Sequence, residues 1–484
     1  MEQSQFFELV CTLSPEERDR FLSYLSSNYA NNSRFRAEIP LVSQMCWEFQ
    51  AAPKQVDLDK KMVFARLFPG QTYADGRVEK LLVEAQKVLR VFLLNEYYHR
   101  EENDFQQSLD FAELVRKRGL AGRHQKMMAK LRKNQEETAQ KGIAYYFNQM
   151  QLEEAICYVK ALNNTRKDDL NIPNFLQSIS NYYHILKLDK TIAYLLQKKL
   201  TTFEDQAFMK ALMAGEDIFS FCLQDAYLVQ VNYMVLSILK KERPDISDVQ
   251  NLYDFFQKHG NKLAFADLKD LSTHLRNFCA IILNNEPDNL EIQHFLFKLQ
   301  MEDLARGFLH YEGKIGAGKF RSVALLAINL KYYDWAEKFI EENKYQIRDD
   351  NDSLDVYRYI KAVFLFETGR YDECYDILPH TSPVNDIVIA CKRLEIKLMY
   401  ETNSDLLHYR IDAFKMFLYR TSPKIYAHNL RQQYHLFIYI LQQILQCPPG
   451  NPKRIDRIIQ KIKQNKTALD WAWLLQKAEA LKSK

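Results

Sequence analysis

A glycine-rich string at residues 313–319 is the part of the sequence closest to a chemical motif. Gly313, Gly318 and Lys319 satisfy the G-x-x-x-x-G-K spacing of a phosphate-binding loop. Phe320 stands where Ser or Thr should bind magnesium, and the stretch before the string has a helical pattern instead of a buried strand. We expect a mobile loop between helices here. One alternative is a weak anion site formed by the backbone amides at the start of the next helix. Another, which we do not favour, is a nucleotide-binding enzyme that uses the Gly313–Lys319 loop.

A second candidate is a basic segment with no acidic residue between positions 114 and 135. Clustered Lys and Arg can bind phosphate backbones or an acidic protein surface, but a solvated helix face has the same composition. The segment also lacks the interleaved aromatic residues that stack on bases. Nucleic acid therefore stays a candidate partner that we do not favour. The basic residues are Arg116, Lys117, Arg118, Arg123, Lys126, Lys130, Arg132 and Lys133.

Signatures of metal and catalytic sites are otherwise missing from the sequence. The acidic stretch at 349–355 lacks the glycine and the glutamate of a calcium loop, so helix capping near Leu354 explains it better. The sequence has no H-E-x-x-H, no C-x-x-C and no G-x-S-x-G. We therefore predict no catalytic residue, no metal and no cofactor, and expect that the protein is not an enzyme.

The elements that position these residues are predicted to be helices. The 484 residues include only 13 Gly and 13 Pro, too few for the frequent turns of a β-rich fold. Hydrophobic residues at 47% and charged residues at 26% are typical of a globular chain. A net charge of +4 and eight dispersed cysteines favour a cytoplasmic protein with free thiols. Neither a signal peptide nor a membrane span is expected.

Helix periodicity and start signals support this prediction. Ser14-Pro15-Glu16-Glu17 combines a capping hydroxyl, a proline at the first helical position and a carboxylate three residues after the cap. Apolar residues recur at helical spacing on two stripes. The stripes are Leu82, Ala85, Leu89, Phe92 and Leu93, and Phe437, Ile440, Leu441, Ile444 and Leu445.

Part of the chain repeats itself. The clearest copies are NQMQLEEAICYV (148–159), LKYYDWAEKFI (330–340) and TGRYDECYDIL (368–378), of which the last two place Tyr333 and Tyr371 38 residues apart. A further copy lies at 186–196 and a weaker one at 299–309. These strings resemble the tetratricopeptide repeat (TPR), a pair of antiparallel helices. Its small residues at the helix–helix contact correspond here to Ala324 with Ala336, and to Ala362 with Cys374. The periods vary from 32 to 40 residues, so the array is irregular.

The first hundred residues carry no repeat signature and suggest four or five helices. Their layout is similar to the N-terminal part of long helical proteins of bacteroidete bacteria that have no assigned function. We therefore expect an N-terminal helical module (1–105), a TPR-like α-solenoid (106–447) and C-terminal capping helices (453–484). The predicted fold class is all-α, a right-handed superhelix of irregular TPR-like hairpins that follows the N-terminal module.

The TPR resemblance implies a scaffold or adaptor that binds a partner protein or peptide in the concave surface of the superhelix. A nucleic-acid-associated regulator using 116–133 is the second interpretation. The resemblance places the partner-binding positions on the first helices of the best repeats. These positions are Arg321, Leu325, Tyr359, Val363 and Phe366.

Overall fold

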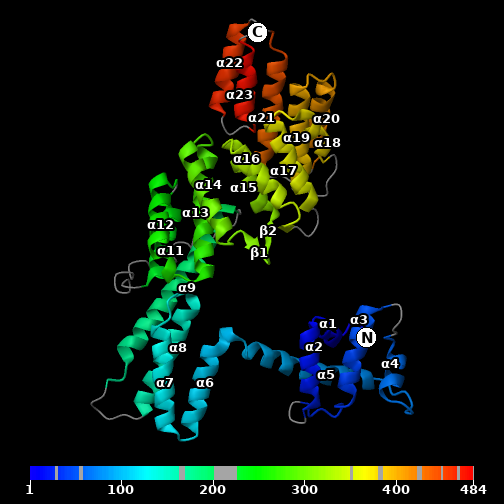
Figure 1. The fold of residues 1–484 in the computed structure, drawn as a ribbon, viewed down its shortest axis with the longest axis vertical. Helices are drawn as coiled ribbons and strands as arrows, with labels where there is room; N and C mark the ends of the chain where they lie inside the picture. Colours follow the sequence, from blue (N-terminus) through cyan, green and yellow to red (C-terminus); the bar gives the residue numbers. More distant parts are fainter. Residues whose placement is uncertain are drawn as a thin grey trace. The chain divides into compact units, whose positions relative to one another are not determined.

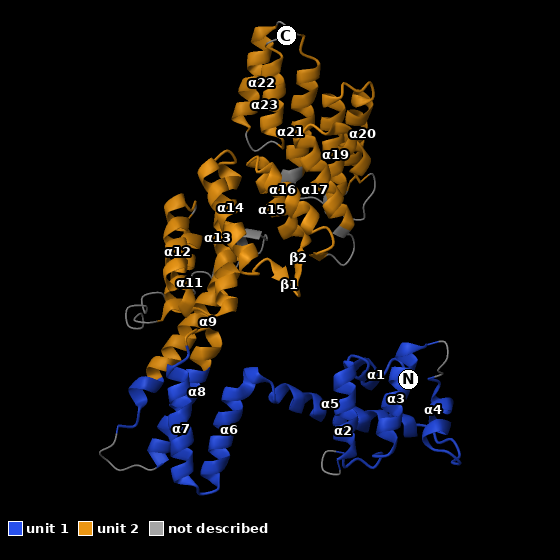
Figure 2. Cartoon of the chain, in the orientation of Figure 1, with its two compact units in different colours: residues 1–138, 148–175 blue, residues 139–147, 176–484 orange. Residues whose placement is uncertain are grey.

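The structure is a computed structural model of an all-α chain. It describes residues 1–27, 31–53, 58–162, 169–200, 226–241, 243–348, 353–379, 385–421, 428–448, 451–465 and 469–482. These residues form 22 α-helices and three short strands (Figure 1), as the shortage of Gly and Pro predicts. Contacts divide the chain into two compact units (Figure 2): unit 1 is 1–138 with 148–175, and unit 2 is 139–147 with 176–484. The domain boundaries expected from the sequence stay a prediction.

Unit 1 begins with five helices around one core. They are α1 (Gln5–Val10), α2 (Pro15–Ser26), α3 (Glu38–Ala51), α4 (Lys60–Leu67) and α5 (Arg77–Tyr98). The predicted start of α2 is confirmed: the Ser14 hydroxyl accepts from the Glu17 amide at 3.2 Å, and the Ser14 amide donates to Glu17 Oε2 at 2.9 Å. The stripe predicted on α5 faces inward, and Ala85 and Leu89 are fully buried.

The rest of unit 1 is a three-helix arrangement with a small core. After the 3₁₀ helix η1 (Glu101–Asn103) come α6 (Asp104–Lys117), α7 (Ala121–Glu136) and α8 (Ile143–Leu162), of which 148–162 belong to this unit. Gly119, with φ of 81°, makes the tight turn between α6 and α7. The buried apolar residues shared by the three helices are Leu109, Ala112, Met128, Leu131 and Leu152.

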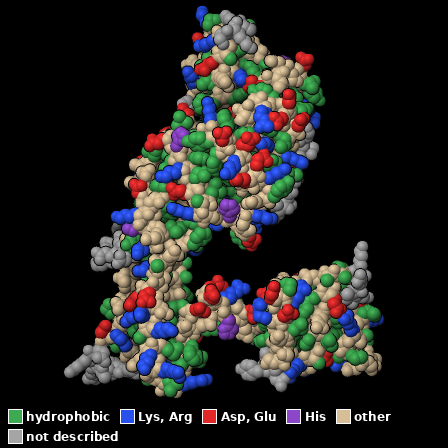
Figure 3. Space-filling model, viewed as in Figure 1, with side chains coloured by type: hydrophobic (Ala, Val, Ile, Leu, Met, Phe, Trp, Pro, Cys, Tyr) green, Lys and Arg blue, Asp and Glu red, His purple; other side chains and the backbone are tan. Residues whose placement is uncertain are grey.

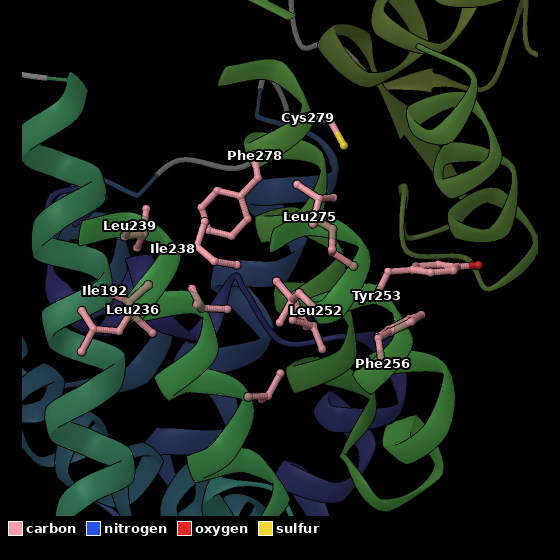
Figure 4. Packing of buried hydrophobic residues seen from close by; sticks show 14 of the residues in the cluster. Ile192, Leu236, Ile238, Leu239, Leu252, Tyr253, Phe256, Leu275, Phe278 and Cys279 are labelled. Atoms are coloured by element: carbon pink, nitrogen blue, oxygen red, sulfur yellow. The ribbon is translucent and has the colours of Figure 1, made fainter. Parts of the chain in front are cut away.

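Unit 2 contains the remaining elements. They are the main part of α9 (Ile172–Leu200), α11 (Tyr227–Lys240), α12 (Ile246–His259), η3 (Gly260–Lys262), α13 (Phe265–Asn285), α14 (Leu290–Ala305), β1 (His310–Tyr311), β2 (Lys314–Gly316), α15 (Ala317–Asn329), α16 (Tyr333–Glu342), β3 (Ile347–Arg348), α17 (Ser353–Glu367), α18 (Tyr371–Ile377), α19 (Asn385–Glu401), α20 (Leu407–Arg420), α21 (His428–Leu445), α22 (Pro452–Gln464) and α23 (Trp471–Ala480). Each of α11–α13 packs against the next, and their apolar faces meet α9 in one core (Figure 4).

Helices α15–α18 form two stacked hairpins. The residues predicted at the helix–helix contacts, Ala324 with Ala336 and Ala362 with Cys374, are all fully buried. Cys374 Sγ lies 3.2 Å from the carbonyl oxygen of Ala362, so the two backbones approach closely where the side chains are small. Helix α17 also packs against α15 and α19, so the first helices of successive hairpins form a row.

The turns inside the two hairpins share one geometry. Lys331 and Gly369 stand at equivalent repeat positions, and both have positive φ, 61° and 77°. One residue later, the amides of Tyr332 and Arg370 donate back to Ala327 and Leu365 at 2.9 and 2.8 Å. A hydrogen bond of this kind caps the C-terminus of a helix that ends in a residue with left-handed backbone conformation. The two hairpins therefore share their turn conformation as well as their small side chains at the helix contacts.

The glycine-rich string forms a β-hairpin and a helix start, where the sequence led us to expect a loop between helices, and that expectation is corrected. Glu312 and Gly313, with φ of 50° and 76°, form the turn between β1 and β2. Strand β2 pairs antiparallel with β1 and parallel with β3. Gly316 is the N-cap of α15, and Phe320 is fully buried. The string differs from a phosphate-binding loop because β2 leads directly into the helix, with no loop between them.

The small residues in the hairpins lead to a stability prediction. Ala362→Leu adds three heavy atoms where α17 meets α18, and we expect it to lower the free energy of unfolding by about 1–3 kcal/mol through overpacking. Ala144→Leu, at an exposed position of α8, is the matched control and should change it by less than about 0.5 kcal/mol. Chemical denaturation followed by circular dichroism makes the comparison. Equal changes in the free energy of unfolding for the two substitutions would contradict close packing of α17 against α18 at Ala362.

Candidate partner-binding site

The residues predicted to contact a partner lie together on α15 and α17, but not all of them are accessible. Tyr359 and Phe366 are only 2% and 5% exposed. Arg321, Leu325 and Val363 are half-buried, and the two aliphatic side chains pack on the hairpin core. The Arg321 guanidinium lies 5.6 Å from the centre of the Tyr359 ring. We call the surface of Arg321, Leu325 and Val363 the α15/α17 face.

Helix α19 is the reason that Tyr359 and Phe366 are buried. The Lys397 ammonium lies 4.6 Å from the centre of the Phe366 ring, and Arg393 interacts with the Tyr359 hydroxyl. Both cations come from α19, which packs on α17. The expectation that Tyr359 and Phe366 offer surface to a partner is therefore corrected. Instead, Phe366 packs under Lys397 of α19, and Tyr359 contacts Arg393 of the same helix.

A charged cluster joins α19 to the last helix, and sequence reasoning missed it. Arg393 Nε lies 3.0 Å from Asp470 Oδ2, and Lys397 Nζ lies 3.2 Å from Asp470 Oδ1. Asp470 precedes α23 and has φ of 52°, a left-handed conformation that aspartate tolerates better than most residues. The signal in the sequence was the spacing of Arg393, Lys397 and Glu401. These three charges recur every four residues and therefore share one face of the helix.

The electrostatics of the cluster favour its charged form. Burial alone would raise the pKa of Asp470, but the charges of Arg393 and Lys397 outweigh burial and hold the pKa below its ordinary value. Burial by itself would lower the pKa of Arg393, and Asp470 raises it in return. The ion pair is therefore a structural clamp, and removal of one partner would leave a buried charge uncompensated.

The other end of α19 holds the middle of α23. Trp473 Nε1 donates to Glu401 Oε1 at 2.6 Å, and Lys477 Nζ lies 2.7 Å from the same oxygen. The Trp473 ring meets Tyr400 edge-on, with 5.2 Å between ring centres. Polar contacts therefore hold α23 against α19 at two places, around Asp470 and around Glu401.

Cations also gather on the other side of the α15/α17 face. Burial lowers the pKa of Lys319 at the start of α15, and the neighbouring charges of Arg276 and Lys269 lower it further. Arg276 forms an ion pair with the buried Asp303, whereas Lys319 and Arg321 have no ion pair with any described residue. An anionic group near Lys319 would therefore relieve the repulsion that Lys319 feels from Arg276 and Lys269.

The structure divides the basic segment into paired and free residues. Arg116 and Lys117 contact Glu113 at 2.7 and 3.6 Å, and Lys133 lies 3.7 Å from Glu137. Arg132 lies 2.9 Å from the buried Glu153, which also accepts from Asn171 Nδ2 at 2.5 Å. Arg132 is therefore committed to the fold of unit 1. Four exposed residues of the segment have no ion pair with any described residue: Arg118, Arg123, Lys126 and Lys130.

Thiol and metal chemistry find little support in the described residues. Burial raises the pKa of Cys46, Cys279, Cys374 and Cys391 to about 12, which makes these thiols poor nucleophiles. No group of three or more His, Cys, Asp or Glu in the described ranges could hold a metal ion. Residues 349–352 of the acidic stretch lie outside those ranges. None of the described helices is long and apolar enough to cross a membrane.

The clamp predicts a pH-dependent stability. Asp470→Asn should lower the free energy of unfolding by about 3 kcal/mol near neutral pH, because it leaves Arg393 without its carboxylate and leaves Lys397 with only Glu367, 3.6 Å away. The folded-state pKa of Asp470 is depressed, so its contribution is present above the unfolded pKa of about 3.9 and is lost as pH falls through the folded pKa. The difference between wild type and variant should therefore narrow in acid.

Urea unfolding followed by tryptophan fluorescence at several pH values measures this difference. Asp412→Asn is the matched control, because the Asp412 side chain is 72% exposed and lies 3.8 Å from Lys415. It should cost less than about 0.5 kcal/mol. A difference for Asp470→Asn that stays constant with pH would show that the carboxylate does not act through its charge.

Comparisons with known proteins add no relative. The chain matches no protein-family model. No similar chain was found among curated proteins or among solved structures. The function is therefore argued from the geometry of the chain itself.

Proposed function

We propose that this protein is a non-catalytic cytoplasmic scaffold or adaptor that binds a partner protein or peptide along the α15/α17 face. In this proposal the hairpins of unit 2 stack as TPR-like units into a right-handed superhelix, and their first helices line its concave side. The observation that carries the proposal is the row of α15, α17 and α19, in which each helix packs on the next. Such a row makes one continuous surface out of separate hairpins.

The resemblance between the two hairpins supports the proposal. The buried small residues at both helix contacts and the left-handed turns at Lys331 and Gly369 agree with a repeated unit. Tyr333 and Tyr371, the aromatic positions of the repeat, contact Phe364 and Phe366 with ring centres 6.3 and 5.7 Å apart. Repeats that share a core in this way can extend a surface without enclosing it.

The side chains of the α15/α17 face indicate the chemistry of the partner. Leu325 and Val363 offer aliphatic contact, and Arg321 offers positive charge that no described acid neutralises. A segment with an apolar residue flanked by Asp or Glu complements this pattern. The proposal involves no reaction, so it assigns no catalytic role to the hairpin at Gly313–Lys319.

The test is a double substitution on this face. Arg321→Glu with Val363→Asp should remove binding of a partner that the wild-type chain recovers, because it reverses the charge and makes the aliphatic position polar. Arg90→Glu, at an exposed position of α5, is the control and should leave recovery unchanged. Affinity purification at two salt concentrations with quantitative mass spectrometry gives the readout. Unchanged recovery of every partner by the double variant would refute the proposal.

A further inference from the structure

A hollow of about 440 Å³ lies between α20 and α21 in unit 2. Its walls include large side chains that are open to solvent: Tyr419 is 78% exposed, Tyr439 is 45% exposed, and Met416 is also exposed. A concave surface with a group of exposed aromatic and apolar side chains is typical of a binding site. We call this feature the α20/α21 hollow.

The charged groups at the α20/α21 hollow are basic. Lys415 and His435 line it, and none of its described lining residues is Asp or Glu. Burial lowers the pKa of His435, and the charge of Arg431 lowers it further, so His435 is neutral near pH 7. Arg431 donates to the Leu418 carbonyl oxygen at 2.7 Å. Lys415 lies 3.8 Å from the exposed carboxylate of Asp412, a contact that neutralises little of its charge in water.

Helix α22 carries a row of cations beside this hollow. Arg454, Arg457 and Lys461 are three and four residues apart and therefore share one face of the helix. None of the three forms an ion pair with a described residue, and the only acid in the sequence of α22, Asp456, pairs with Lys482 at 2.6 Å. At 1.5 Å per residue the row is about 10 Å long. Over much of the face in view in Figure 3, by contrast, acidic and basic side chains are interspersed.

Lys461 joins the row to the hollow. Its ammonium lies 4.0 Å from the centre of the Tyr439 ring. A hydrogen bond from Lys461 holds the pKa of Tyr439 below its ordinary value, and the charge of Lys461 acts in the same direction. Gln443 Nε2 donates to the same hydroxyl at 2.8 Å, so the ring is held from two sides. The hollow and the row form one surface. We call it the α20–α22 surface, and it consists of Tyr419, Tyr439, Arg454, Arg457 and Lys461.

The apolar face of α22 is not available to a ligand. Its four isoleucines are at most 8% exposed and pack in one core with α21 and α23. A basic amphipathic helix binds a membrane by inserting its apolar face, and α22 cannot do so while it is folded. A ligand of this region therefore meets cations and tyrosine rings.

We propose that the α20–α22 surface binds single-stranded nucleic acid. Bases would stack on the exposed rings of Tyr419 and Tyr439, and phosphates would pair with Arg454, Arg457 and Lys461. Proteins that bind single strands without sequence preference combine a basic surface with aromatic side chains in this way.

A single strand complements both parts of the surface, whereas other anions complement one. An acidic peptide would pair with the cations but need not supply flat rings for the tyrosines. A duplex presents phosphates, but its bases stack on one another and leave the tyrosines uncovered. The basic segment at 114–135 lacks the combination, because it contains no Phe, Tyr or Trp.

The experiment is a titration of the full chain with fluorescein-labelled probes, read by anisotropy at several salt concentrations. The probes are RNA and DNA single strands of about twelve nucleotides, a DNA duplex of the same length and polyglutamate. We expect both single strands to bind more tightly than the duplex and polyglutamate, because only they can stack on the tyrosines. Their affinity should fall as salt rises, since phosphate binding releases counterions.

Substitutions of tyrosine measure the stacking. Tyr419→Ala should weaken the single strands at least about fivefold, which corresponds to the loss of one stacked base. Tyr419→Phe keeps the ring and should leave the affinity unchanged. Tyr345→Ala removes an exposed tyrosine outside the α20–α22 surface and is the matched control. It should also change nothing.

Substitutions of the cations measure the phosphate contacts. Arg457→Glu with Lys461→Glu should weaken the single strands at least about tenfold. It should also reduce the slope of log affinity against log salt by about 1.4, since each phosphate contact accounts for about 0.7. Lys126→Glu with Lys130→Glu has the same charge change and spacing in unit 1, and should alter neither quantity.

Several results would overturn the proposal. Equal affinity for polyglutamate and the single strands, or tighter binding of the duplex, would show that stacking does not contribute. Loss of binding in the Lys126 and Lys130 variant alone would assign nucleic acid to the basic segment of unit 1. No binding of single strands up to about 100 μM at low salt would remove the site. The proposed function is tested separately, because Arg321→Glu with Val363→Asp changes no residue of the α20–α22 surface.

Discussion

The structure depends on apolar helix faces that a single hairpin cannot cover. One continuous core contains Phe320 of α15, Phe339 of α16, Phe364 of α17 and Leu394 of α19, so each hairpin completes the burial of its neighbour. Fully burying a large apolar side chain contributes about 1.5–3 kcal/mol, and most of that would be lost if a hairpin stood alone. Stacking is therefore a condition of folding, and the surfaces available for binding are those that stacking leaves open.

Much of the fold was predictable because its causes are local. The cap at Ser14 and the stripes on α5 and α21 are set by residues a few positions apart, and the structure confirms them. The contact between Ala362 and Cys374 was predictable for a related reason, since a repeat copies the residues that let two helices approach. The hairpin at β1–β2 was not predictable in this way. Its pairing with β3 joins residues about thirty positions apart, and the strands are too short to leave a pattern.

The candidate site shows where local reasoning ends. Arg321, Leu325 and Val363 were placed on a common face from repeat position alone. The burial of Tyr359 and Phe366 depends on α19, and the two cations on α19 depend on Asp470, 73 residues beyond Lys397. Similarly, a count of basic residues could not show that Arg132 forms an ion pair with Glu153, whereas Lys126 and Lys130 form none with a described residue. Charge composition identifies a basic segment, but only tertiary contacts show which of its cations already have an acidic partner within the fold.

The long separation between Arg393 and Asp470 has a consequence for synthesis. A ribosome releases α19 well before it has made residue 470, so Arg393 emerges without its counter-ion, whereas Lys397 can already meet Glu367 of α17. During that interval the nascent chain has a helix whose apolar sides can pack on α17 while its charged row still requires water. Closure of the ion pair between α19 and α23 must therefore wait until Asp470 has been translated, and until then the guanidinium of Arg393 remains unpaired.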